Sequence, residues 1–75
     1  MTQKFKINNK VEIIANNYHS QNAVGDIGIV TGITIVVDTI YYKITVEGKL
    51  DMYNWSLEDE LRLYKSTINP NTKIL

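Results

Sequence analysis

The side chains best suited to chemistry lie in one polar stretch, where His19 and Ser20 are followed by Asp26. A hydrolase triad needs a base that a second group holds against an exposed nucleophile. His19 is the only histidine of the chain, and its neighbours are turn-forming polar residues. One histidine among scattered carboxylates also gives no ligand spacing typical of zinc or calcium sites. We therefore expect His19 to be a solvated loop residue, with no metal, no other cofactor and no enzymatic activity.

An acidic run from Glu58 to Glu60 and three glycines are the next candidates for a site. The acidic run would attract a basic partner, but acidic residues also stabilise the start of a short helical turn, which is the reading we favour. No Lys-Ser or Lys-Thr pair follows Gly25, Gly28 and Gly32 at the spacing of a phosphate-binding loop. Strand curvature and turn geometry explain these glycines better.

Apolar residues alternate with others along residues 27–37 and 40–46, which predicts two strands. With Asp38-Thr39 as the turn between them, Ile33 lies opposite Ile44, and apolar residues meet on a single face. A slip of one residue would destroy that match, so the pattern itself selects the register. The residues that we expect on the core face of the first strand are Ile27, Ile29, Ile33, Ile35 and Val37.

A second turn at Gly48-Lys49 would place Trp55 opposite Tyr42, and Tyr53 opposite Ile44. Aromatic side chains would then extend the core face, because large aromatics are the main source of buried area in a small domain. The alternative is that these rings form a ligand platform. We favour the core, with one edge of Trp55 exposed.

The remaining elements complete a small all-β fold. Residues 11–14 form a short strand, and residues 15–24 form a polar loop. Ser56 and Asp59 resemble a capping box that opens one 3₁₀ turn, after which residues 61–63 return as a closing strand. The glycines of the long strand suit a sharply bent sheet. The sequence therefore predicts a five-stranded barrel with one 3₁₀ turn before its last strand.

An apolar cluster remains at the end of the long hairpin, where the expected register places Val36 beside Tyr41 on the outer face. Exposed apolar clusters of this kind often mark interfaces. The alternative is burial of both faces by the first loop or by the tail. We rate the two interpretations equally.

Length, charge and composition limit the class of protein. The chain has 75 residues, which suffice for one domain, and we expect this domain over residues 1–65 with a flexible tail over residues 66–75. Eight basic and eight acidic residues give a formal net charge of zero, which is unlike the footprint of a non-specific nucleic-acid binder. No apolar run reaches the length of a membrane span, and we expect a cytoplasmic protein.

The order of these elements resembles the small Src-homology-3-like barrels. More narrowly, residues 11–14, the loop and residues 25–30 resemble the KOW motif of ribosomal proteins and transcription elongation factors. Residues 42–63, with Trp55, are similar to many short bacterial and phage proteins of the same barrel class. KOW modules that hold RNA carry basic residues near the loop, whereas this loop is neutral and Asp26 is acidic.

Three functional interpretations follow from the sequence. The first is a non-enzymatic protein-binding module, such as a phage or mobile-element accessory or inhibitor protein that binds a host protein, with a surface built from Tyr18, Val36, Tyr41 and Trp55. The second is a KOW-like nucleic-acid or ribonucleoprotein binder. The third is a homo-oligomer that joins through the apolar hairpin.

Overall fold

A computed structural model of the chain describes residues 3–17 and 19–65. Tyr18 and the predicted tail, 66–75, lie outside the described residues. The described part is all-β with five strands and one short 3₁₀ turn, as the sequence predicts. No helix within it is long and apolar enough to cross a membrane. In chain order, the elements are β1 (Lys10–Ile13), β2 (Ile27–Val36), β3 (Thr39–Thr45), β4 (Trp55–Leu57), η1 (Glu58–Glu60) and β5 (Leu61–Leu63).

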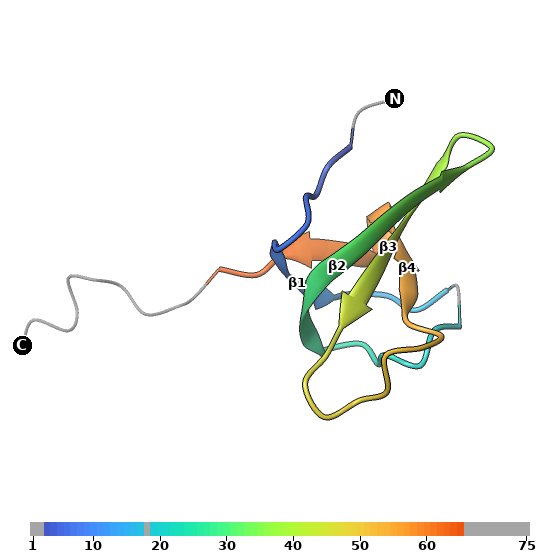
Figure 1. Cartoon of the computed structure of the whole chain (residues 1–75). Helices are drawn as coiled ribbons and strands as arrows, with labels where there is room; N and C mark the ends of the chain where they lie inside the picture. Colours follow the sequence, from blue (N-terminus) through green and yellow to red (C-terminus); the bar gives the residue numbers. More distant parts are fainter. Residues whose placement is uncertain (1–2, 18, 66–75) are drawn as a thin grey trace, which may run out of the picture.

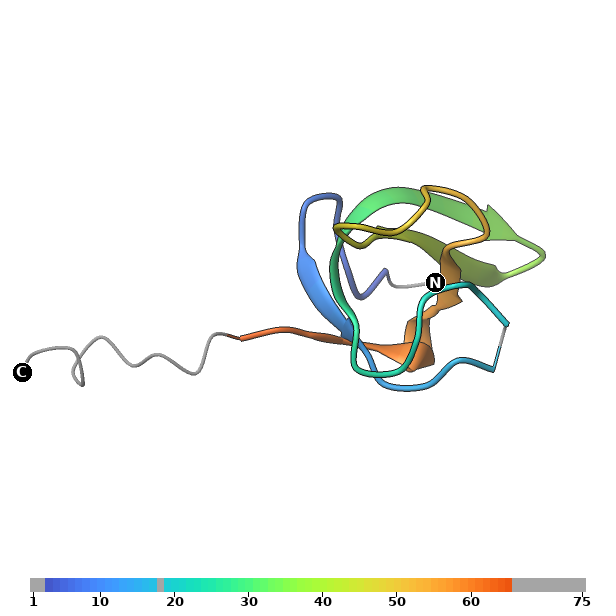
Figure 2. The same cartoon turned by 90° about the horizontal axis from the view of Figure 1, so that it is seen from below.

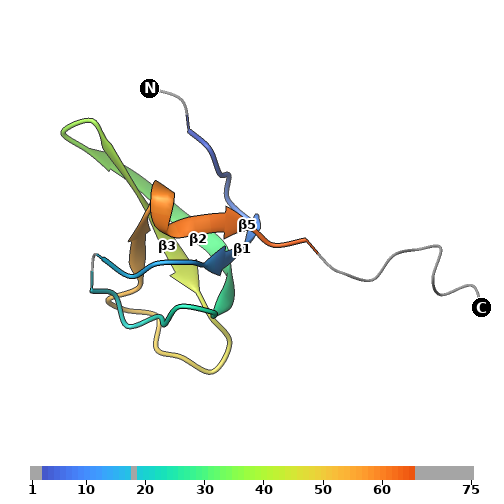
Figure 3. The ribbon, with the colours of Figure 1, turned by 180° about the vertical axis from the view of Figure 1, so that it is seen from behind.

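The strands form one antiparallel sheet in the order β4-β3-β2-β1-β5 (Figure 1). The sheet is strongly curled, as the view from below shows (Figure 2). Its two edge strands, β4 and β5, follow one another in sequence through η1 (Figure 3). They do not pair with each other in the described part of the chain, so the sheet is open at this seam.

The core fills the concave side of the curled sheet and includes a residue from outside the strands. Phe5 is fully buried, and its ring meets that of Tyr42 edge-on at a centroid distance of 5.2 Å. The segment after Phe5 is tied to β2, because the N–H of Asn8 donates to the Val30 carbonyl and the N–H of Val30 donates to the Asn9 carbonyl. Among the residues that the structure describes, the buried apolar ones are Phe5, Val11, Ile13, Val30, Ile40, Tyr42, Ile44 and Leu61.

A β-bulge between Val30 and Gly32 corrects the predicted faces of β2. Before the bulge the buried residues are Gly28 and Val30, not the predicted Ile27 and Ile29. The extra residue reverses the alternation, because side chains change faces with every residue along a strand. Beyond the bulge, the predicted Ile33 packs against the core.

The turn between β2 and β3 is Val37-Asp38, one residue earlier than predicted. Both residues have positive φ, 47° for Val37 and 61° for Asp38, as a tight two-residue hairpin turn requires. Ile35 therefore pairs with Ile40, a shift of two positions from the predicted register. A shift of two positions keeps every side chain on its face, so the outward placement of Val36 and Tyr41 survives the error.

The predicted register between β3 and β4 is wrong by one residue, and this error has larger consequences. Tyr42 pairs with Ser56, and Trp55 pairs with Lys43 on the outer face. The place predicted for an aromatic beside Ile44 is taken by Asn54, whose buried side-chain amide donates to the Ile44 carbonyl at 2.9 Å. The rings of Trp55 and Tyr53 thus lie outside the core.

Candidate functional site

The outer face of β2, β3 and β4 carries the candidate site, which we call the aromatic face. Thr34 on β2 lies opposite Tyr41 on β3, and Tyr41 lies opposite Leu57 on β4. Successive strand residues point to opposite faces, so these side chains share the convex side of the sheet. Val36 follows Thr34 on the same face and is 51% exposed. Thr34, Val36, Tyr41 and Trp55 line a hollow of about 270 Å³.

The position of Trp55 on β4 depends on a glycine of β2, Gly32. Gly32 pairs with Lys43, which pairs in turn with Trp55, so the three residues form one row across the face. A Cβ atom at Gly32 would lie 3.4 Å from Cη2 of Trp55 and 3.2 Å from Cβ of Lys43. The missing side chain therefore lets the indole lie close over β2. Gly32 therefore serves the packing of Trp55, whereas sequence reasoning explained this glycine by strand curvature.

Trp55 also lines a second hollow, of about 300 Å³. It is lined by Trp55, Tyr53, His19 and Ser20. His19 is exposed and has a φ of 58°, as expected of a turn residue in a polar loop. The loop after β1 is tied to the segment before β4, because the N–H of Gln21 donates to the Tyr53 carbonyl at 2.7 Å, and this brings His19 near Tyr53. Trp55 thus belongs to both hollows.

The charged groups beside the aromatic face are neutralised by one another. Nζ of Lys43 lies 3.2 Å from a carboxylate oxygen of Asp51. Hydrogen bonds from Asn54, Thr45 and Lys43 lower the pKa of Asp51 below its usual value, so this carboxylate stays ionised. The face therefore presents aromatic and β-branched surface with an internally paired charge at its margin.

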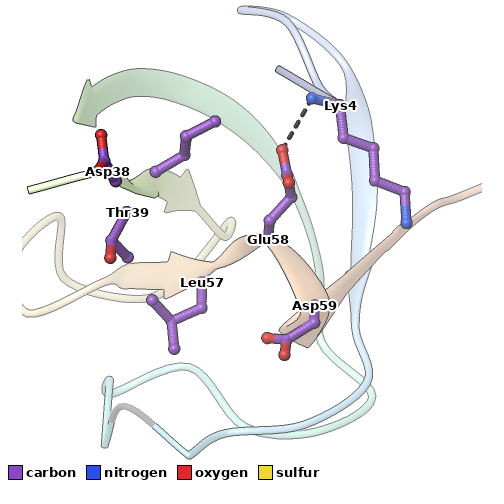
Figure 4. A pocket seen from close by; sticks show the side chains of 7 residues that line it. Lys4, Asp38, Thr39, Leu57, Glu58 and Asp59 are labelled. Atoms are coloured by element: carbon purple, nitrogen blue, oxygen red, sulfur yellow. Dashed lines mark hydrogen bonds between the residues drawn. The ribbon is translucent and has the colours of Figure 1, made fainter. Parts of the chain in front are cut away.

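A larger hollow of about 380 Å³ lies at the end of the sheet, and its polar groups serve the fold (Figure 4). Glu58 reaches into it, but this carboxylate already accepts hydrogen bonds from the Tyr42 hydroxyl at 2.6 Å and from the Lys4 main-chain N–H at 2.8 Å. Asp38 and Asp59 lie at its rim. In the described part of the chain, no group of three or more His, Cys, Asp or Glu side chains is arranged to hold a metal ion.

The structure brings three of the four predicted site residues together. Val36, Tyr41 and Trp55 line one hollow, and the fourth, Tyr18, lies outside the described residues. Sequence reasoning missed Thr34 as their neighbour, although its place two residues before Val36 puts it on the same face. Sequence reasoning also placed Trp55 mainly in the core. The corrected register puts this residue on the outer face, where it lines the hollow.

No protein-family model matches this chain, and neither the curated proteins nor the solved structures give a significant match.

Proposed function

We propose that this chain is a Src-homology-3-like barrel that acts as a non-enzymatic protein-binding module, with the aromatic face as its contact surface. The curled five-stranded antiparallel sheet supports the barrel class, because its first and last strands in spatial order are joined through a single 3₁₀ turn. Phe5 adds to the core, and the segment around Asn8 bonds to β2 at Val30. The eight buried apolar residues of the described part are a core of the size expected for so small a domain.

The observation that carries the proposal is the hollow shared by Thr34, Val36, Tyr41 and Trp55. Trp and Tyr dominate the binding energy of protein interfaces, because they bury large areas at little entropic cost. Both residue types line the same hollow as an exposed valine here, on strands of a sheet rather than on a loop. A preformed apolar hollow on a rigid element favours a protein side chain as its occupant.

The pairing of cations argues against the nucleic-acid interpretation. Of the basic residues that would form a phosphate-binding surface, Arg62 contacts Glu12 at 2.6 Å, Lys43 contacts Asp51 at 3.2 Å, and Lys49 pairs with Asp26. Binding to a phosphate backbone draws on cations that are free to neutralise phosphates, which releases the counterions condensed on the nucleic acid. These three are already matched by carboxylates, so a protein partner is the better proposal.

Affinity capture with two matched double variants tests the proposal. Val36→Ser with Tyr41→Ser removes the apolar wall of the hollow, and Leu50→Ser with Leu63→Ser removes exposed apolar area elsewhere. The lysate is split and treated with or without nuclease. We expect a nuclease-resistant protein that the wild type and the control capture and that the first variant loses. Equal capture by both double variants would contradict this surface, and capture lost on nuclease treatment would favour nucleic acid.

A further inference from the structure

One edge of β2 is open along the outer half of the β2–β3 hairpin. β1 pairs with β2 only at residues 27–29, and the next contact on that edge is made by Asn8 and Asn9 with Val30. Beyond Val30, none of residues 3–17 and 19–65 pairs with this edge. The hairpin projects past the rest of the sheet in two opposite views (Figures 1 and 3).

The alternation of hydrogen bonds shows which main-chain groups face this edge. The N–H of Ile44 donates to the Asn54 carbonyl, so the main chain of Ile44 is directed towards the β4 side. Alternate residues of an antiparallel strand direct their N–H and C=O groups to opposite neighbours. Tyr41 therefore bonds towards β2, where it pairs with Thr34. The N–H and C=O groups of Ile33 and Ile35 must then point away from β3, to the open edge.

Beyond the bulge between Val30 and Gly32, this edge lacks the features by which proteins protect exposed strands. Residues 33–37 read Ile-Thr-Ile-Val-Val, with no charge, proline or glycine, and Ile35 is 57% exposed. Natural edge strands are usually blocked by lysine, proline, bulges or a covering segment. The opposite edge of the sheet, at β4, follows that rule. The N–H of Gln21 donates to the carbonyl of Tyr53 just before the strand, and the Glu60 carboxylate accepts the N–H of Leu57 at 2.8 Å.

We propose that the open edge of β2 pairs antiparallel with the same edge of a second copy of this chain, about a two-fold axis at Ile35. In this register, Ile35 lies opposite its own counterpart and exchanges two main-chain hydrogen bonds with it. Thr34 lies opposite Val36, so each face of one hairpin continues into the same face of the other. The contact uses a main-chain edge rather than the side-chain hollow of the aromatic face.

A second copy suits this edge because the segment is complementary to itself. The pairing brings only Ile, Thr and Val side chains together, which are the residues that pack best across strands. No like charges meet at the axis, and the formal net charge of zero gives no long-range repulsion between copies. A charged residue of either sign in place of Ile35 would lie directly opposite the same charge in the second copy.

The test measures molar mass by light scattering and sedimentation across a dilution series of the full chain. We expect two chains per particle at high concentration and one on dilution. Ile35→Lys and Ile35→Glu each should weaken association by about tenfold or more, because like charges oppose each other at the axis. An equimolar mixture of the two variants should restore the two-chain particle. Leu50→Lys, at a 68% exposed loop residue, is the matched control and should associate like the wild type.

Amide hydrogen exchange provides a readout that does not depend on a variant. The Ile35 amide should exchange more slowly as the wild-type concentration rises, while the Val24 amide in a remote loop should not change. Amide spectra of both charge variants should match the wild-type fold. A single chain at every concentration, wild-type-like association of either charge variant, or a mixture that stays monomeric would each overturn the proposal.

Discussion

The hydroxyl group of Tyr42 donates a hydrogen bond of 2.6 Å to the Glu58 carboxylate, and so joins the centre of β3 to the 3₁₀ turn. The same oxygen accepts the main-chain N–H groups of Lys4 at 3.2 Å and Phe5 at 3.3 Å. Tyr42 is fully buried, and its ring packs on Phe5. A single side chain therefore holds the N-terminal segment over the core at the seam between β4 and β5.

Tyr42→Phe should lower the free energy of unfolding by about 1–3 kcal/mol, because it leaves a buried Phe5 N–H without its acceptor and keeps the ring. Chemical denaturation measures the loss. Tyr53→Phe is the control, because Tyr53 is 78% exposed and its change should be negligible. Equal stability of the two variants would show that the hydroxyl has no structural role.

Stability should also depend on pH in the alkaline range through Tyr42. Burial, and then the hydrogen bond to Glu58, raise the pKa of Tyr42 above its ordinary value of 10.0. The unfolded chain then loses this proton before the folded chain does, so the stability present below the unfolded pKa is lost as the pH rises past it. Unfolding curves should weaken more steeply with pH for the wild type than for Tyr42→Phe. Parallel slopes would exclude this linkage.

The turn of the hairpin is open to a stabilising substitution. Val37 is 89% exposed and has a φ of 47°, a conformation that β-branched residues strongly disfavour. Val37→Asn should therefore raise the free energy of unfolding of the single chain by about 0.5–1 kcal/mol, because Asn tolerates this conformation and no packing within the chain is lost. Val24→Asn is a control at an exposed residue outside the turn and should have little effect. Thermal unfolding of both variants measures this difference, and a melting temperature of Val37→Asn below that of the wild type would contradict the predicted stabilisation.

Glycine at position 28 should be required by close packing. A Cβ atom there would lie 2.6 Å from the Thr45 carbonyl oxygen and 2.8 Å from Cγ2 of Ile44. Gly28→Ala should thus cost about 1–3 kcal/mol through overpacking. Gly32→Ala, whose nearest atom would be 3.2 Å away, should cost less and should change the fluorescence of Trp55. If the two glycines prove equally replaceable, the close approach at Gly28 is not a constraint.

Alternation along the chain was sufficient to predict the strands and the outward placement of Val36 and Tyr41. An error of two positions in the hairpin register left both residues on the same face. The one-residue error in the register between β3 and β4 could not be found from the local pattern, because the contacts that set this register join residues far apart in sequence. Asn54 is buried where its side-chain amide donates to the carbonyl of Ile44, and Phe5 is buried where its ring packs on Tyr42. Local pattern says nothing of such distant partners, so the outward turn of Trp55 could not be predicted.

Glu60 should be the buried member of the acidic run on which the fold depends, beside the partly exposed Glu58. Its side chain is 1% exposed, and its carboxylate accepts the N–H groups of Leu57 at 2.8 Å and of Asn17 in the first loop. Glu60→Gln replaces one accepting oxygen by an NH₂ group, which must then face an N–H donor. The buried mismatch should cost about 1–3 kcal/mol and should speed amide exchange at Asn17. Asp59→Asn changes the same charge at an exposed neighbour and should leave both measurements near the wild type. Equal effects of the two substitutions would mean that the run acts through its charge alone.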